Sequence, residues 1–220
     1  MSKIKLFSGM DFSGKTTIIN GINEKMPSKF SIKKKFLTPI DLIENVRKRD
    51  TWLSPEEWKP LLQENIQKDI KEYKENGLIL IDSLWIIKYL AGKIEKNDKQ
   101  DEEEIIILKE LLKKYPEMDS FYITVSMNER IKRFQARAKS GNEITGSDKL
   151  IMDTDKFERR EQIYKKIVLE YFPNTKTIDT TDIDLEQTIN VIINDNNFLK
   201  DMWKDRRFWE YLSLKIFCFW

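Results

Sequence analysis

Histidine is absent from the 220 residues of this chain, and cysteine occurs once, as Cys218. The lack of histidine excludes histidine general bases, histidine-containing catalytic triads and histidine-ligated metal ions. A single cysteine excludes an intrachain disulfide and disfavours a structural zinc site. This composition suits a reducing compartment, and we expect a cytoplasmic protein.

Long hydrophobic runs are also missing, because no segment approaches the roughly 20 apolar residues that cross a membrane. The apolar stretch near the N-terminus is short and interrupted by Lys5, so we expect no signal peptide and no membrane association. Neither charge sign dominates, since 39 Lys and Arg residues face 37 Asp and Glu residues. This balance gives no general support to nucleic-acid binding, although it leaves a local basic patch open.

Glycine is scarce, at seven residues, yet two of them lie in one short motif. Residues 9–16 read Gly-Met-Asp-Phe-Ser-Gly-Lys-Thr, which matches the P-loop pattern G-x-x-x-x-G-K-[ST]. Glycines let such a loop turn tightly and direct its N–H groups at phosphates, while the lysine reaches the terminal phosphates and the threonine binds Mg²⁺. We therefore expect ATP to contact Gly9, Ser13, Gly14, Lys15, Thr16 and Thr17.

The surroundings of the motif favour this interpretation over a chance glycine-rich turn. Residues 3–8 alternate like a strand, and residues 16–22 open a helix. Further strands are predicted at 30–37, 78–82, 121–125 and 175–179. Further helices are predicted at 54–76, 105–115 and 155–172, from the capping box at 126–129 and from about 184. Residues 93–104 indicate a solvated loop and helix start, and 139–153 a mobile loop. The alternation predicts an α/β fold, a P-loop three-layer α/β/α sandwich with a parallel sheet and helices on both faces.

Asp82 ends the apolar strand at 78–81. In a parallel α/β sheet, the carboxyl ends of the strands meet at the ligand-binding edge. We therefore expect Asp82 to join Thr16 at a Mg²⁺ site, the alternative being an ordinary acid in a turn.

Arg133 and Arg137 lie four residues apart on one predicted helix face, just before the loop at about 139–153. Arginines beside a flexible lid can close over a triphosphate and neutralise the charge on a phosphoryl group in transit. The alternative is a solvated basic face.

Taken together, these segments resemble the thymidylate kinases, a family of P-loop nucleoside monophosphate kinases. Residues 8–17 resemble the family's phosphate loop, with an acid at its third position. Residues 122–126 and the arginine-bearing helix, 157–164 and 177–179 are similar to its later elements, so the likeness covers about residues 3–195.

The resemblance implies a five-stranded parallel sheet, MgATP as phosphate donor, a nucleoside monophosphate as acceptor, a role in nucleotide biosynthesis and a homodimer. Asp11 would contact the sugar hydroxyl of the acceptor, which places it with Lys15, Arg133 and Arg137 among the catalytic residues. Family members without an arginine in the loop use a basic lid residue, here Lys139 or Lys149.

Three departures concern the acceptor phosphate. Residues 82–85 read Asp-Ser-Leu-Trp where the family has Asp-Arg-Tyr or Asp-Arg-Phe, residues 38–41 have no adjoining arginine, and residues 61–70 contain none. The acceptor therefore stays open between a nucleoside, a monophosphate, and a modified base or sugar within DNA. A P-loop NTPase with a regulatory role is the remaining alternative.

We expect the kinase domain to span residues 1–196. Residues 197–220 form an aromatic-rich C-terminal extension. This extension either packs on the same domain as an extra helix or presents a partner surface.

Overall fold

The computed structural model describes residues 4–25, 30–33, 54–75, 78–141, 144 and 148–194. The predictions for residues 34–41 and for the extension at 197–220 fall outside these ranges. Among the described helices, none combines the length and hydropathy needed to cross a membrane.

A five-stranded parallel sheet forms the centre of the molecule, which confirms the predicted α/β class. The strands lie in the order β2-β3-β1-β4-β5, so the strand that leads into the P-loop is central. The strands are β1 (Ile4–Ser8), β2 (Phe30–Lys33), β3 (Leu78–Asp82), β4 (Asp119–Thr124) and β5 (Lys176–Asp179).

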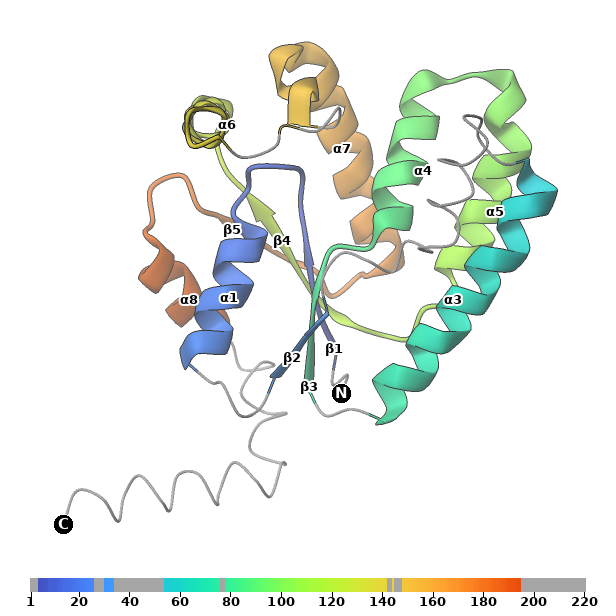
Figure 1. The fold of residues 1–220 in the computed structure, drawn as a ribbon, viewed down its shortest axis with the longest axis horizontal. Helices are drawn as coiled ribbons and strands as arrows, with labels where there is room; N and C mark the ends of the chain where they lie inside the picture. Colours follow the sequence, from blue (N-terminus) through green and yellow to red (C-terminus); the bar gives the residue numbers. More distant parts are fainter. Residues whose placement is uncertain are drawn as a thin grey trace.

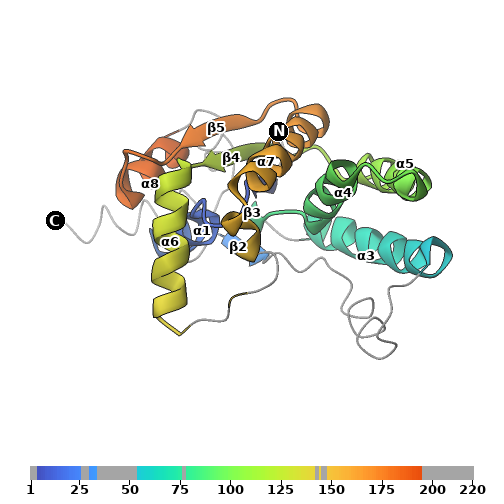
Figure 2. The same ribbon diagram turned by 90° about the horizontal axis from the view of Figure 1, so that it is seen from above.

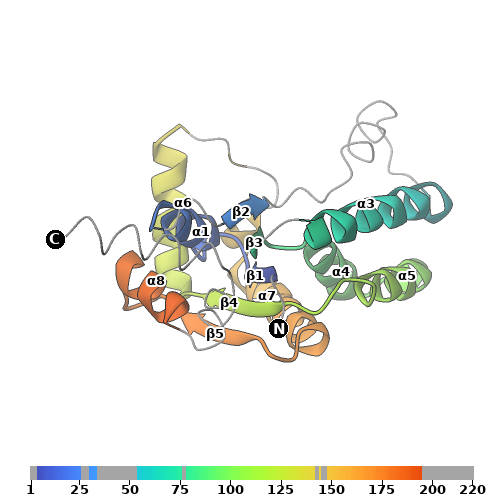
Figure 3. The same ribbon diagram turned by 90° about the horizontal axis from the view of Figure 1, so that it is seen from below.

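Helices cover both faces of this sheet (Figure 1). Helices α1 and α8 lie on one face, and α4 and α7 lie together on the other, with α5 and α3 further out. Views from above and below show the same layers (Figures 2 and 3). The helices are α1 (Lys15–Lys25), α3 (Pro55–Glu75), α4 (Trp85–Lys96), α5 (Glu102–Leu112), α6 (Met127–Lys139), α7 (Thr154–Tyr171) and α8 (Leu185–Ile193), with short 3-10 helices η1 (Lys99–Asp101) and η2 (Asp148–Met152).

Alternation along the central strand explains why the core has two halves. Leu6 is buried in the cluster under α4 and α7, whereas its neighbour Phe7 is buried in the cluster under α1 and α8. Phe7 also stacks on Phe121 of β4, with ring centroids 5.4 Å apart. Lys5 faces the same side as Phe7, and its ammonium is fully buried 2.5 Å from Asp119.

The strand register brings three loops to one edge. Phe7 pairs with Asp82 of β3 and with Phe121 of β4. The amide of Ser83 then donates to the Phe7 carbonyl at 2.9 Å. The P-loop, which follows β1, therefore lies between the chain segments that leave β3 and β4.

Two polar stretches contain more helix than the sequence predicts. The stretch at 93–104 begins inside α4, a helix that the sequence reading did not place, and continues through η1 into α5. The stretch at 139–153 includes η2, and Asp153 caps α7 by accepting from the Lys156 amide at 3.1 Å. Ile151 and Asp148 are buried in this turn, so the segment packs against the rest of the domain.

Candidate phosphate-binding site

The P-loop adopts a backbone that requires glycine at both ends. Gly9 has a φ of 142°, and a Cβ atom there would lie 2.2 Å from the Ile123 carbonyl oxygen. Gly14 has a φ of 94° and packs beside the Arg133 guanidinium. Both positions therefore exclude side chains, one by close approach of β4 and the other by conformation.

Lys15 begins α1 and folds back over its own loop. Its ammonium donates to the Met10 carbonyl at 2.9 Å and to the Ser13 hydroxyl at 3.2 Å. The charge therefore lies inside the curve of the loop, at the N-terminal end of a helix. Backbone amides, the helix dipole and an ammonium together favour an anion at this position.

Thr16 and Asp82 meet, as the strand order predicts. The Thr16 hydroxyl donates to Asp82 Oδ2 at 2.5 Å, and Asp82 is 7% exposed at the end of β3. Within the described part of the chain, no three His, Cys, Asp or Glu side chains form a metal-binding cluster. The hydroxyl and carboxylate nevertheless fit Mg²⁺, which usually takes one or two protein oxygens and completes its shell with phosphates and water.

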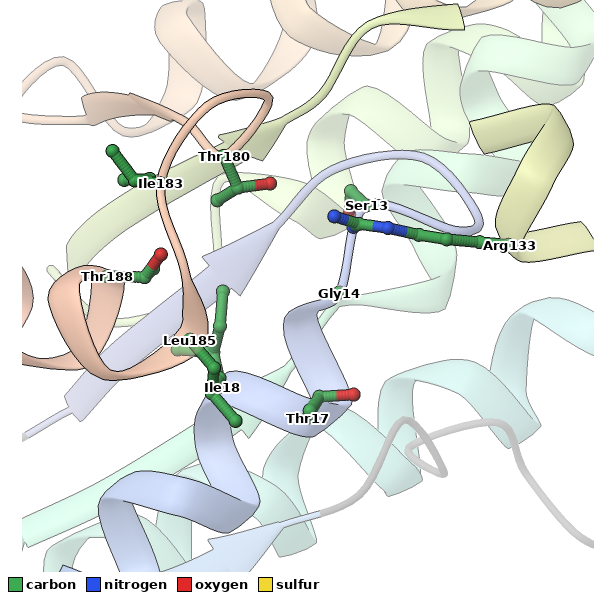
Figure 4. Close-up of a pocket in the computed structure, with 9 residues that line it drawn as sticks. All are labelled: Ser13, Gly14, Thr17, Ile18, Arg133, Thr180, Ile183, Leu185 and Thr188. Atoms are coloured by element: carbon green, nitrogen blue, oxygen red, sulfur yellow. The ribbon is translucent and has the colours of Figure 1, made fainter. Parts of the chain in front are cut away.

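A cavity of about 200 Å³ opens on the α1–α8 side of the loop (Figure 4). Arg133 extends from α6 over Ser13 and Gly14, while the segment between β5 and α8 forms the opposite wall. The Arg133 guanidinium donates to the Phe12 carbonyl at 3.2 Å and to Glu129 Oε1 at 3.2 Å.

Arg137 contacts the side chain at the tip of the loop and the segment before α7. Its guanidinium lies 6.0 Å from the centroid of the Phe12 ring and 3.8 Å from Asp148 of η2. Arg133 is thus brought to the phosphate loop itself, and Arg137 joins the side chain at the tip of the loop to the segment before α7. Lys139 and Lys149 are both exposed.

Arg130 is the principal site-supporting residue that the sequence reading missed. Its side chain is completely buried. It donates to the carbonyls of Asp11 at 2.9 Å and Val125 at 3.1 Å, and it pairs with Glu161 of α7. Burial lowers the pKa of the guanidinium, with the Glu161 carboxylate acting in the opposite direction. Arg130 therefore fastens the phosphate loop to β4 and α7.

Asp11 has a partner on another element. The Lys88 ammonium of α4 lies 2.6 Å from Asp11 Oδ2. Lys88 in turn lines a second cavity, of about 410 Å³, between α4 and α7. The phosphate loop thus has one cavity on its α1–α8 side and a second, larger one reached through Asp11.

No protein-family model and no curated protein sequence matches the chain. Its structure resembles those of nucleotide and nucleoside kinases. Thymidylate kinase from Candida albicans aligns with a TM-score of 0.64 and 18% identity over 91% of this chain and 93% of that one. The chain has the fold of the thymidylate kinases. Deoxyadenosine kinase from M. mycoides, with dCMP and dCDP bound, aligns with a TM-score of 0.60 and 20% identity over 88% and 98%. Thymidylate kinase from Ehrlichia chaffeensis aligns with a TM-score of 0.52 and 18% identity, over 86% of this chain and 95% of that one.

Proposed function

We propose that this protein is a phosphotransferase of the thymidylate kinase type, which moves a phosphoryl group from ATP to a nucleotide-type acceptor. The observation that carries the proposal is the convergence of Lys15, Arg133 and the Thr16–Asp82 pair on one glycine-bounded loop. The fold shared with thymidylate and deoxyadenosine kinases supports the same reaction class.

Each group has a role that follows from its charge and place. The loop amides and Lys15 bind the β- and γ-phosphates, because they present donors and one positive charge to the same anion. Arg133 lies where it can neutralise negative charge as the phosphoryl group moves. Thr16 and Asp82 would hold Mg²⁺, which would withdraw negative charge from the phosphates.

In this proposal, the adenosine part of ATP binds in the cavity shown in Figure 4. Its walls combine apolar side chains with the hydroxyls of Thr180 and Thr188. This mixture suits a flat base that needs apolar contact and a few hydrogen bonds. The acceptor then approaches the γ-phosphate from the other side of the loop, where Asp11 lies.

The test measures transfer of labelled γ-phosphate from ATP to a mixed set of nucleosides and nucleoside monophosphates. We expect Lys15→Ala to lower turnover at least 100-fold, a loss of about 3 kcal/mol in transition-state stabilisation. Lys25→Ala is the matched control, because Lys25 is an exposed lysine at the other end of the same helix. Equal turnover of the two variants, or ATP hydrolysis by the wild-type protein without transfer to any member of the set, would contradict the proposal.

A further inference from the structure

The cavity between α4 and α7 provides a second binding surface beside the phosphate loop. Trp85 and Tyr89 of α4 form one wall, with ring centroids 5.6 Å apart, and Arg160 of α7 lies opposite. The cavity shares no lining residue with the one in Figure 4. Its connection to the phosphate loop is Lys88, which lines the cavity and contacts Asp11.

Gly92 keeps this cavity open. It lies in the interior of α4, where glycine is less favourable than alanine. A Cβ atom at this position would lie 3.8 Å from Arg160 Cζ, so a side chain here would contact the guanidinium, which is 19% exposed. Planar guanidinium and aromatic surfaces bind planar rings. The helix therefore contains an unfavourable residue at the place where its missing side chain leaves room for a planar ligand beside Arg160.

Four cations line the cavity, and three of them pair with carboxylates; the fourth, Lys96, lies at the C-terminal end of α4. Lys93 lies 2.8 Å from Asp101 and 2.5 Å from Glu104, and Arg160 pairs with Glu95. Burial acts to lower the pKa of Lys93, but the hydrogen bonds to its two carboxylates outweigh burial and raise it. These pairs hold their charges within the protein, so the wall of the cavity offers limited net attraction to an anion.

The end of the cavity nearest the phosphate loop also offers little net attraction to an anion. A phosphate dianion would have to lie beside the Asp11 carboxylate or take Lys88 from it, and both outcomes oppose binding. A sugar hydroxyl faces no such conflict, because it can accept from the ammonium and donate to the carboxylate. Ser83, where thymidylate kinases have an arginine, is 6% exposed, and its hydroxyl lies 3.4 Å from the Phe7 carbonyl. It therefore adds no charge to this end.

We propose that the acceptor is a nucleoside, with its base in the cavity over Gly92 and Arg160 and its reacting hydroxyl at the Asp11–Lys88 pair. This inference rests on the proposed phosphoryl transfer from ATP and chooses the nucleoside over the nucleoside monophosphate as its acceptor. The hydroxyl oxygen forms the new bond to the γ-phosphorus as the bond from phosphorus to the β–γ bridging oxygen breaks. ADP leaves with that electron pair, and the hydroxyl proton passes to the Asp11 carboxylate and then to solvent.

The first measurement compares nucleosides with their own monophosphates as acceptors for the wild-type protein. We expect kcat/KM for the preferred nucleoside to exceed that for its monophosphate at least tenfold. A monophosphate that is the better acceptor, or transfer to a base or sugar in an oligonucleotide only, overturns the assignment of substrate class. Transfer to no acceptor at all defeats the proposed function itself, and the substrate class with it.

The second measurement fills the cavity. We expect Gly92→Met to lower kcat/KM for the nucleoside at least 100-fold, while the Kd for ATP stays within threefold and the thermal midpoint is unchanged or raised. Glu103→Met is the control, because Glu103 is an exposed residue of α5 that does not line the cavity. A Gly92→Met protein that binds ATP and phosphorylates nucleosides normally overturns the location of the base.

The third measurement removes the negative charge beside Lys88. Asp11→Asn keeps the shape of the side chain and removes the carboxylate, while the backbone carbonyl that Arg130 binds is unchanged. We expect nucleoside kcat/KM to fall at least tenfold, and the ratio of monophosphate to nucleoside use to rise at least tenfold. An unchanged ratio shows that the carboxylate does not select against the phosphate and overturns this part of the inference.

Discussion

Arg130→Ala should destabilise the protein more than removal of any exposed arginine or lysine in α6. The guanidinium is fully buried, and its hydrogen bonds reach the backbone of two segments and the carboxylate of Glu161. Removal of one member of a buried ion pair costs about 3–5 kcal/mol, because the other charge stays behind without its partner. Glu161 is 19% exposed and can regain some water, so we expect about 3 kcal/mol, near the lower end of that range.

Urea unfolding at neutral pH measures this loss directly, through the midpoint and slope of the transition. Lys132→Ala is the control on the same helix, because that side chain is 75% exposed and should change stability by less than about 0.5 kcal/mol. Combination of Arg130→Ala with Glu161→Gln completes a double-mutant cycle. Glu161→Gln should lower the free energy of unfolding much less in the Arg130→Ala protein than in the wild type. A loss below about 1 kcal/mol for Arg130→Ala would refute the account of Arg130 as the anchor of the loop.

Three further predictions address the loop, its arginine and the core beneath it. Arg133→Ala should lower kcat for phosphoryl transfer at least about tenfold, with Lys132→Ala as control, because Arg133 alone of the two lies over the loop; equal kinetics would make it a structural residue. Gly9→Ala should lower ATP affinity at least tenfold in a direct binding assay, because the new methyl group would meet the Ile123 carbonyl. Gly141→Ala should leave the affinity unchanged, because Gly141 also has a positive φ, of 73°, but no atom lies within 4 Å of the added Cβ. Burial raises the pKa of Tyr164 to about 12, above the usual value of 10.0, although the hydroxyls of Ser83 and Ser8 act to lower it. Folding therefore keeps a proton that the unfolded chain releases, and the stability so conferred is present below pH 10 and lost as the pH rises toward 12. Tyr164→Phe should reduce this alkaline loss in urea titrations between about pH 9 and 12; identical pH profiles for the two proteins would contradict the reasoning.

The sequence was most informative where local chemistry and spacing coincide. Two glycines at fixed separation, a lysine and a threonine predicted the loop, and the structure shows that both glycines are required by conformation. The meeting of Thr16 with Asp82 was also predictable, because strand polarity places both at one edge of a parallel sheet. The catalytic and binding roles of these residues stay predictions, as do the homodimer and the domain boundary near residue 196.

The residues that the sequence did not reveal depend on tertiary packing. Arg130 shares a helix face with Met127, Ile131 and Phe134, all packed against the main core cluster. An arginine at such a position signals a buried charge with partners elsewhere, but the i,i+4 spacing of Arg133 and Arg137 drew the prediction to the outer face. The Lys88–Asp11 pair depends on the direction of α4, which no local pattern specifies.

The hydrogen bond from Arg130 reaches the main-chain carbonyl of residue 11, whereas the carboxylate of the same residue contacts Lys88. Support of the loop and the proposed choice of acceptor therefore depend on different atoms of one residue. Any side chain that tolerates the local backbone can replace Asp11 without removal of the Arg130 hydrogen bond. Position 11 is thus a place where acceptor preference can evolve, or be redesigned, while the phosphate loop keeps its anchor.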